Sequence, residues 1–202
     1  MFKTFVNMFQ ETSPEALEKI ELYYSLLVKW SKSLNLVQKE TLRPEMFEMR
    51  HLIDCWQLIP HLKREQTILD VGSGAGLPGI LLSIAGFPVD LVEQDMNKVA
   101  FLKNCKVLLN LNCRILPVDI YLLSDKYSQM TSRAFSQLNT LLQIQWNVSR
   151  ETKGIFLKGV SYEKEIEEAR LHWDFDFAVK NSLSADQGKI VIIHELKKKC
   201  FT

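Results

Sequence analysis

The stretch Asp70-Val71-Gly72-Ser73-Gly74-Ala75-Gly76-Leu77-Pro78-Gly79 separates two apolar runs of different character. Residues 67–71 suit a buried strand, and residues 80–84 suit the start of a helix. The glycines between them lack a Cβ, so the backbone can lie directly against a ligand. The helix that follows points free N–H groups and a partial positive charge at the turn. The sequence therefore predicts a strand, a binding turn and a helix, with a ligand that has a polar or anionic end.

Three classes of nucleotide ligand use such a turn. A P-loop is excluded because no lysine follows the glycines. A dinucleotide site stays open, since residues 74–79 spell Gly-x-Gly-x-x-Gly, although Pro78 removes one N–H from the helix start. S-adenosylmethionine also stays open, because it carries no phosphate and its ammonium group favours a nearby acid. Asp70 is the acid predicted to hold that group, and a helix-capping role for Asp70 is the alternative.

Glu93 ends the next predicted strand, about 20 residues beyond the turn. A carboxylate in this position can accept both ribose hydroxyls of a nucleoside in charge-assisted hydrogen bonds. Asp95 competes for the role but falls past the end of the strand. The alternative for Glu93 is an ordinary solvated acid.

From residue 67 onward, short apolar runs alternate with helical patterns. The runs predict strands over Thr67–Val71, Val89–Glu93, Arg114–Val118, Met130–Ala134, Gly154–Lys158, Phe175–Val179 and Ile190–Leu196. The helical patterns cover Leu77–Ala85, Lys98–Leu111, Leu138–Val148 and Tyr162–His172. This alternation predicts an α/β fold with a mostly parallel seven-stranded sheet flanked by helices, and a ligand beyond the carboxyl ends of the strands. The last two strands lack a long helix between them and predict an antiparallel hairpin at one edge.

Two helical stretches precede the turn. One starts at Ser13-Pro14-Glu15, and the other starts at Arg43-Pro44-Glu45 and stops near Pro60. About 60 residues are marginal as a separate domain. We therefore expect residues 1–66 to be an N-terminal helical extension packed on the core, and residues 67–202 to be the ligand-binding domain.

The amino-acid composition limits which ligands and partners the chain is expected to bind. The chain has 202 residues, 25 basic and 24 acidic, so binding to nucleic acid would need local basic clusters. The four cysteines show no Cys-x-x-Cys spacing and the four histidines are scattered, so we expect no metal site. No signal peptide and no apolar run of about 18 residues is visible, which predicts a cytoplasmic chain without a membrane span. Nothing suggests an obligate partner, and we expect a monomer.

Four segments, in one order, resemble a known family. They are Arg50-His51-Leu52-Ile53-Asp54-Cys55, the Asp70–Gly79 run, Ser132-Arg133-Ala134-Phe135 and Leu157-Lys158-Gly159. By these segments the sequence resembles the bacterial 16S ribosomal RNA guanine-N7 methyltransferases, a family also called glucose-inhibited division protein B. The resemblance covers almost the whole chain.

The resemblance implies a class I, Rossmann-like methyltransferase fold, S-adenosylmethionine as cofactor, and methylation of N7 of a guanine in 16S ribosomal RNA. The substrate is then free 16S RNA or the small ribosomal subunit. Guanine N7 has a lone pair and no proton, so the reaction needs no general base, and we name no catalytic residue. Two other functions stay open: an NAD-dependent oxidoreductase of the Rossmann type, and a cofactor-binding ribosome-assembly factor without turnover.

Site residues come from both sources. The residues themselves point to Asp70, Gly72, Gly74 and Glu93 as cofactor-binding. The resemblance again marks Gly72 and adds four further positions, which are Leu77, Val118, Asp119 and Arg133. Asp119 stands where the family usually has a glutamate.

Arg50, His51 and Arg133 are the predicted substrate-binding residues. As alternatives, His51 forms an internal hydrogen bond with Asp54 that fixes the extension, and Arg133 is a plain surface residue.

Overall fold

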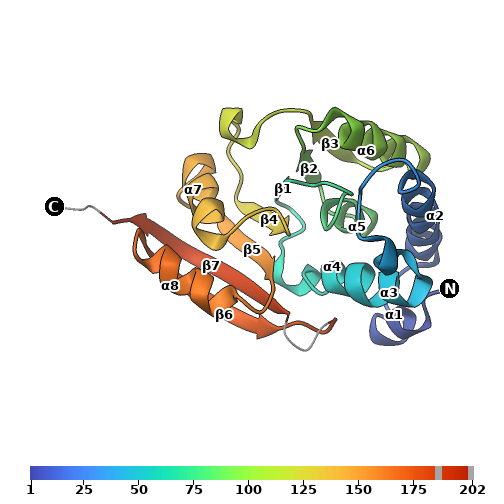
Figure 1. The fold of residues 1–202 in the computed structure, drawn as a ribbon, viewed down its shortest axis with the longest axis horizontal. Coiled ribbons are helices and arrows are strands. Elements are labelled where there is room, and N and C mark those ends of the chain that lie inside the picture. The colour runs from blue at the N-terminus through green and yellow to red at the C-terminus, as the bar shows by residue number, and fades with distance from the viewer. Residues whose placement is uncertain (185–187, 200–202) are drawn as a thin grey trace.

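A seven-stranded sheet runs through the middle of the molecule, in a computed structural model that describes residues 1–184 and 188–199 (Figure 1). The strands lie in the order β3-β2-β1-β4-β5-β7-β6. Their bounds are β1 Ile68–Val71, β2 Val89–Val92, β3 Cys113–Leu116, β4 Gln129–Arg133, β5 Lys153–Lys158, β6 Trp173–Asn181 and β7 Lys189–Lys198.

The first five strands pair in parallel, and β7 pairs antiparallel with both β5 and β6. The predicted mostly parallel sheet and the antiparallel pair of last strands are both confirmed. β6 is the edge strand, and β7, which comes last in the chain, lies between β5 and β6. The chain reverses its direction across the sheet between β1 and β4. Ligands bind beside such a reversal on open α/β sheets.

Helices cover both faces of the sheet (Figure 1). The longer ones are α2 Pro14–Trp30, α5 Gly79–Ile84, α6 Met96–Leu108, α7 Leu138–Val148 and α8 Tyr162–Arg170. Side chains of successive strand residues point to opposite faces, so Ile68 joins one buried cluster with α2, α5 and α6 while Leu69 joins another with α7 and α8. The two clusters give the sheet two apolar cores.

Residues before β1 form α1 Lys3–Met8, α2, η1 Lys39–Leu42, α3 Pro44–Phe47, η2 Glu48–Ile53, α4 Asp54–Trp56 and η3 Ile59–His61. Ser13 caps α2 as predicted, because its hydroxyl accepts a hydrogen bond from the Ala16 N–H at 3.2 Å. Phe5, Tyr23 and Phe47 of this region are fully buried in the same cluster as the helices of one sheet face.

Four predicted helices differ in detail from those observed. The helix expected over Lys98–Leu111 is observed over Met96–Leu108, and the helix expected over Tyr162–His172 ends at Arg170. The stretch after Pro44 is not one regular helix, since residues 48–53 form a π-helical segment between α3 and α4. The helix expected over residues 77–85 begins only at Gly79, because residues 72–78 are used by the turn. Among the described residues, we find no helix with both the length and the apolar character that a membrane crossing needs.

Candidate functional site

A cavity of about 960 Å³ opens at the carboxyl ends of β1, β2 and β4. The glycine turn after β1, the segment after β2 and the segment after β3 form one wall. The end of β4 and residues 36–51 of the N-terminal region form the rest of the lining. The residues predicted for the site fall on these segments, and most of them line this cavity.

The glycine turn passes close to another loop at Gly72. This residue has φ +66°, and a Cβ added to it would lie 2.0 Å from the Cδ2 atom of Phe135. Only glycine fits such a position without strain and without displacing the ring. Gly72, Gly74 and Leu77, three of the residues predicted to bind the cofactor, line the cavity.

Glu93 follows β2 and is 8% exposed, with its side chain on the cavity wall. One carboxylate oxygen accepts the Gly74 N–H at 2.8 Å, and the other accepts the Asp95 N–H at 2.9 Å. Each oxygen keeps a further lone pair for a ligand. Asp95 lies past the strand and caps α6 through a hydrogen bond from the Asn97 N–H. Of the two acids, Glu93 is therefore the one that can face a ligand.

Asp70 does not lie on the cavity wall, which corrects the predicted contact with an ammonium group. Its side chain is fully buried, and its carboxylate accepts the Gly79 N–H at 3.1 Å and the Thr131 hydroxyl at 3.3 Å. Burial raises the pKa of Asp70 to about 6, although these hydrogen bonds oppose the shift. Asp70 thus holds the N–H of Gly79, the first residue of α5, against the sheet. This role resembles the helix-capping role that was the alternative for Asp70.

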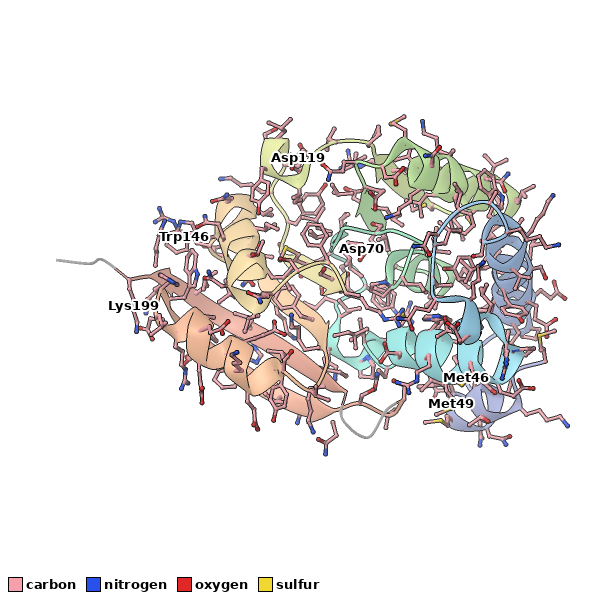
Figure 2. The ribbon with its side chains drawn as sticks, in the orientation of Figure 1. Met46, Met49, Asp70, Asp119, Trp146 and Lys199 are labelled. Atoms are coloured by element: carbon pink, nitrogen blue, oxygen red, sulfur yellow. The ribbon has the colours of Figure 1, made fainter. Side chains whose placement is uncertain are left out.

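Val118 and Asp119 follow β3 and line the cavity on the side away from β4. The Asp119 carboxylate accepts the Tyr121 N–H at 3.0 Å and starts η4 Ile120–Leu122. Figure 2 shows Asp119 on this outer segment and Asp70 near the centre of the molecule. The cavity wall after β3 therefore combines the apolar side chain of Val118 with the exposed carboxylate of Asp119.

Arg133 ends β4 and reaches back to the N-terminal region. Its Nε lies 3.0 Å from an Asp54 carboxylate oxygen, and its Nη2 donates to the Arg50 carbonyl at 2.7 Å. Arg133 also lines the cavity. Since these contacts use two of the donor nitrogens of its guanidinium group, Arg133 is anchored rather than free at the surface.

Arg50 and His51 both line the cavity. His51 does not pair with Asp54, so this alternative is wrong: its Nε2 lies 2.8 Å from the Thr41 hydroxyl, and Asp54 pairs with Arg133. Burial, together with the nearby Arg133 charge, lowers the pKa of His51 to about 3. His51 is therefore neutral at physiological pH, while Arg50 is exposed at the mouth of the cavity.

Sequence reasoning missed two residues of the site. Phe135 is 41% exposed on the cavity wall, although its motif was recognised. Tyr23 of α2 is fully buried, and its hydroxyl donates to the Ala75 carbonyl of the glycine turn at 2.7 Å. Only the tertiary fold brings Tyr23 to the turn, since 52 residues separate the two.

The residues that the structure describes include no group of three or more histidine, cysteine or acidic side chains that could hold a metal ion. Cys55, Cys105 and Cys113 are buried free thiols. Cys200 lies outside the described residues.

Comparison with known proteins supports one family. Residues 16–194 match the family model described as GidB, rRNA small subunit methyltransferase G. Two relatives named "Ribosomal RNA small subunit methyltransferase G" illustrate the similarity. The protein from Rickettsia massiliae (strain Mtu5) is 39% identical over 193 residues, which cover 95% of this chain and 99% of the relative. The protein from Rickettsia felis is 40% identical over 93% of this chain and 98% of the relative.

Solved structures agree on the fold. The PH0226 protein from Pyrococcus horikoshii aligns with a TM-score of 0.63 at 13% identity, over 83% of this chain and 98% of that protein. A ribosomal protein L11 methylase from Lactobacillus delbrueckii aligns with a TM-score of 0.58 at 14% identity, over 71% and 76% of the two chains. A glycopeptide N-methyltransferase complexed with sinefungin aligns at 0.59 and 10% identity, over 72% and 94%. The predicted class I methyltransferase fold is thereby confirmed.

Proposed function

The chain belongs to the rRNA small subunit methyltransferase G family, and we propose that it methylates N7 of a guanine in 16S ribosomal RNA with S-adenosylmethionine as the methyl donor. The relatives named "Ribosomal RNA small subunit methyltransferase G" align with this chain over nearly their whole length, which supports a methyltransferase acting on small-subunit ribosomal RNA. The proposal assigns Glu93, the glycine turn and the wall after β3 to the cofactor. It assigns the mouth of the cavity to the RNA.

The observation that supports the cofactor class is the pairing of Glu93 with the glycine turn. The Gly74 N–H, which a pyrophosphate would need, already donates to the Glu93 carboxylate at 2.8 Å. A second anion at this point would meet that carboxylate at close range. A ribose, in contrast, offers hydroxyl donors to the lone pairs that Glu93 keeps. The site therefore fits a nucleoside without phosphate and disfavours NAD.

The rest of the wall fits the same ligand. Leu77, Val118 and Ile120 supply apolar side chains on the cavity beside Glu93, as a purine ring requires. In the proposal, Asp119 lies at the exposed edge of this wall and accepts a hydrogen bond from the purine amino group. The amino-acid end of the ligand is assigned to the glycine turn, of which Gly72 and Gly74 line the cavity.

The proposed methyl transfer needs no side chain that donates or accepts a proton. When bound, the cofactor supplies an activated methyl group: its carbon–sulfur bond breaks as the bond to guanine N7 forms, and the base gains a positive charge. N7 loses no proton, so we assign no general base. Neutral His51 is consistent with this, since a pKa of about 3 suits neither an acid nor a cation at pH 7. The protein contributes alignment and exclusion of water.

The RNA is proposed to approach over Arg50 and Lys98, two basic residues on the cavity lining. With a net charge of +1 the chain has no general attraction for RNA, so local cations must supply the phosphate contacts. Arg50 is exposed and next to His51, so both stay candidates for substrate contact. We further propose a cytoplasmic monomer that acts on free 16S RNA or on the assembled small subunit.

The test uses ribosomal material from cells that lack the protein. Purified protein is incubated with labelled S-adenosylmethionine and either free 16S RNA or small subunits, and the RNA is digested to nucleosides for mass spectrometry. We expect label in 7-methylguanosine from at least one of the two substrates. Binding without any labelled nucleoside would instead support an assembly factor. Tighter binding of NAD than of S-adenosylmethionine in a fluorescence titration would refute the cofactor assignment.

A further inference from the structure

We propose that the ring of Phe135 is the surface on which the target base stacks during methyl transfer. It rests on the proposed function, and it gives a positioning role to Phe135, which the resemblance includes in the motif Ser132-Arg133-Ala134-Phe135 without a role of its own. It starts from the exposure of the ring, since 41% of a large apolar side chain is open to the cavity.

The order of the strands places Phe135 at the substrate end of the cavity. Across the sheet in the order β3-β2-β1-β4, the segments after the strands carry Val118, Glu93, Gly72 and Phe135 in turn. The proposed nucleoside occupies the positions after β3 and β2, and the amino-acid end reaches the glycine turn after β1. The space beyond the turn, at the end of β4, is left for the group that receives the methyl. Phe135 lies there.

The ring is held from both sides. Before it, Ala134 adopts φ 53°, an uncommon conformation for a residue with a side chain, and Arg133 is anchored to Asp54. After it, the Ser136 carbonyl accepts a hydrogen bond from the Lys158 ammonium at 2.9 Å. Strained backbone that the surroundings hold in place is frequent at ligand sites. The loop therefore presents a fixed ring rather than a mobile one.

The ring also contacts the turn that binds the cofactor, because it lies over the Cα of Gly72. A base stacked on Phe135 would thus be adjacent to the methyl donor. Enzymes that modify a base read it outside the helix, with stacking on aromatic side chains. A purine offers a large face for such stacking, and alanine substitutions of stacking aromatics cost about 1–3 kcal/mol per base.

A conservative pair of variants tests the proposal. Phe135→Leu keeps apolar packing over Gly72 but removes the aromatic face, and Phe135→Tyr keeps both. Leu171→Ala is the control, because Leu171 is a large apolar residue that is 65% exposed and lies outside the cavity lining. All proteins are assayed on small subunits or 16S RNA from cells lacking the protein, at saturating cofactor.

We expect Phe135→Leu to lower kcat about 5-fold to 150-fold, which corresponds to the 1–3 kcal/mol of a lost stacking contact. The Kd for RNA should change less than about threefold, since phosphate contacts dominate RNA affinity. The Kd for S-adenosylmethionine should also stay within about twofold. Phe135→Tyr should retain at least a third of the rate, and Leu171→Ala should retain full kcat.

Two results would overturn the inference while leaving the proposed function intact. One is an unchanged kcat in Phe135→Leu. The other is a loss of cofactor affinity in that variant as large as its loss of rate, which would mean that the ring only supports the glycine turn. Failure of the unmodified protein to methylate either substrate would instead refute the proposed function itself.

Discussion

Glu93 joins two roles in one side chain. Its oxygens hold the backbone N–H groups of Gly74 and Asp95, and the same carboxylate faces the cavity. We expect Glu93→Ala to weaken the binding of S-adenosylmethionine at least about tenfold, since a charged hydrogen bond contributes about 1.5–3 kcal/mol. Calorimetric titration measures the change. Glu65→Ala, an exposed acid outside the cavity, should bind like the unmodified protein; equal affinities in both variants would contradict the assignment.

Gly72 supports a second prediction at this scale. Gly72→Ala places a methyl group 2.0 Å from the Phe135 ring and imposes φ +66° on a residue with a Cβ. The ring must move, and the left-handed backbone adds about 1 kcal/mol of strain. We expect a lower melting temperature and weaker cofactor binding. Gly159→Ala is the control, because nothing lies within 4 Å of its added Cβ, and it should change neither quantity measurably.

Asp70 gives a pH dependence with a definite sign. Burial raises its pKa from 3.8 to about 6, so the folded protein binds more protons than the unfolded chain between these values. The contribution of Asp70 to the free energy of unfolding therefore falls as the pH rises from 4 to 6. Asp70→Asn removes this term. The difference in unfolding free energy between the variant and the unmodified protein should shift in favour of the variant by about 2 kcal/mol between pH 4 and pH 6.

Denaturant titrations at pH 4, 5 and 6 measure that difference. His51 acts in the opposite direction, because burial lowers its pKa to about 3 and it favours folding as the pH rises. Its contribution is common to both proteins and cancels in the comparison. A constant difference across the three pH values would show that folding does not raise the pKa of Asp70.

The sequence predicts the position of a cavity residue when that residue directly follows a strand. Glu93 follows β2 directly, and its distance from the turn along the chain identifies it. Asp70 lies within β1, one residue before its end and opposite Leu91, and the side chains of a strand alternate between faces. The carboxylate of Asp70 points into the interior, where the Gly79 N–H meets it. Sequence spacing locates the backbone of such a residue and leaves the direction of its side chain open.

At the scale of elements, α2 supports the glycine turn from behind through Tyr23. Tyr23→Phe removes the hydroxyl and leaves the buried Ala75 carbonyl without that donor, which costs about 1–3 kcal/mol. We expect lower stability together with weaker cofactor binding, measured by thermal unfolding and by calorimetry. Tyr24→Phe is a matched control on the same helix, because the Tyr24 hydroxyl donates to Leu42 instead. It should lose stability and keep its cofactor affinity.

A fall in affinity in both tyrosine variants would mean that general loosening of α2, rather than the contact with Ala75, reaches the site. An unchanged affinity in Tyr23→Phe would show that the turn keeps its shape without this hydrogen bond.

Elements with a regular apolar period were predictable, and those shaped by contacts were not. α7 has the predicted bounds Leu138–Val148, because its apolar residues recur with the helical period. The π-helical segment Glu48–Ile53 was missed, since each of its residues is compatible with an α-helix. In this segment the Glu48 carboxylate accepts the Phe5 N–H at 2.7 Å, a contact over 43 residues that no local pattern encodes.

At the scale of the whole molecule, Asp54 connects three distant parts of the chain. It lies in α4, pairs with Arg133 of β4, and accepts the Ser184 hydroxyl at 2.6 Å from the segment after β6. Asp54→Ala leaves Arg133, four-fifths buried, without its carboxylate. We expect the free energy of unfolding to fall by about 1.5–3 kcal/mol. Weaker cofactor binding should accompany it, because Arg133 lines the cavity.

Chemical unfolding and calorimetry check this prediction. Glu15→Ala also removes a carboxylate from an ion pair, with Lys19, but on the solvent face of α2. Exposed pairs of this kind contribute little, so the control should unfold like the unmodified protein. If the two variants behaved alike, Asp54 would not be a structural junction.

The general arrangement of the sheet followed from the alternation of strands and helices, but the place of β7 did not. Apolar residues in Ile190–Ile193 suit a strand buried on both faces, and the sequence predicts the antiparallel partner. The sequence does not show whether the second edge of β7 pairs with β5 or faces solvent. This choice is made by long-range pairing and is invisible to local pattern.

The position of β7 has a consequence for biosynthesis. This strand leaves the ribosome after the other six, yet it occupies an inner place, with β5 on one side and β6 on the other. Until it arrives, the emerging chain exposes the apolar edge of β5, and β6 has no partner. Unpaired edges of this kind invite association with other nascent chains. A message cut short before codon 189 therefore yields a product prone to aggregate, even though every cavity-lining residue has already been translated.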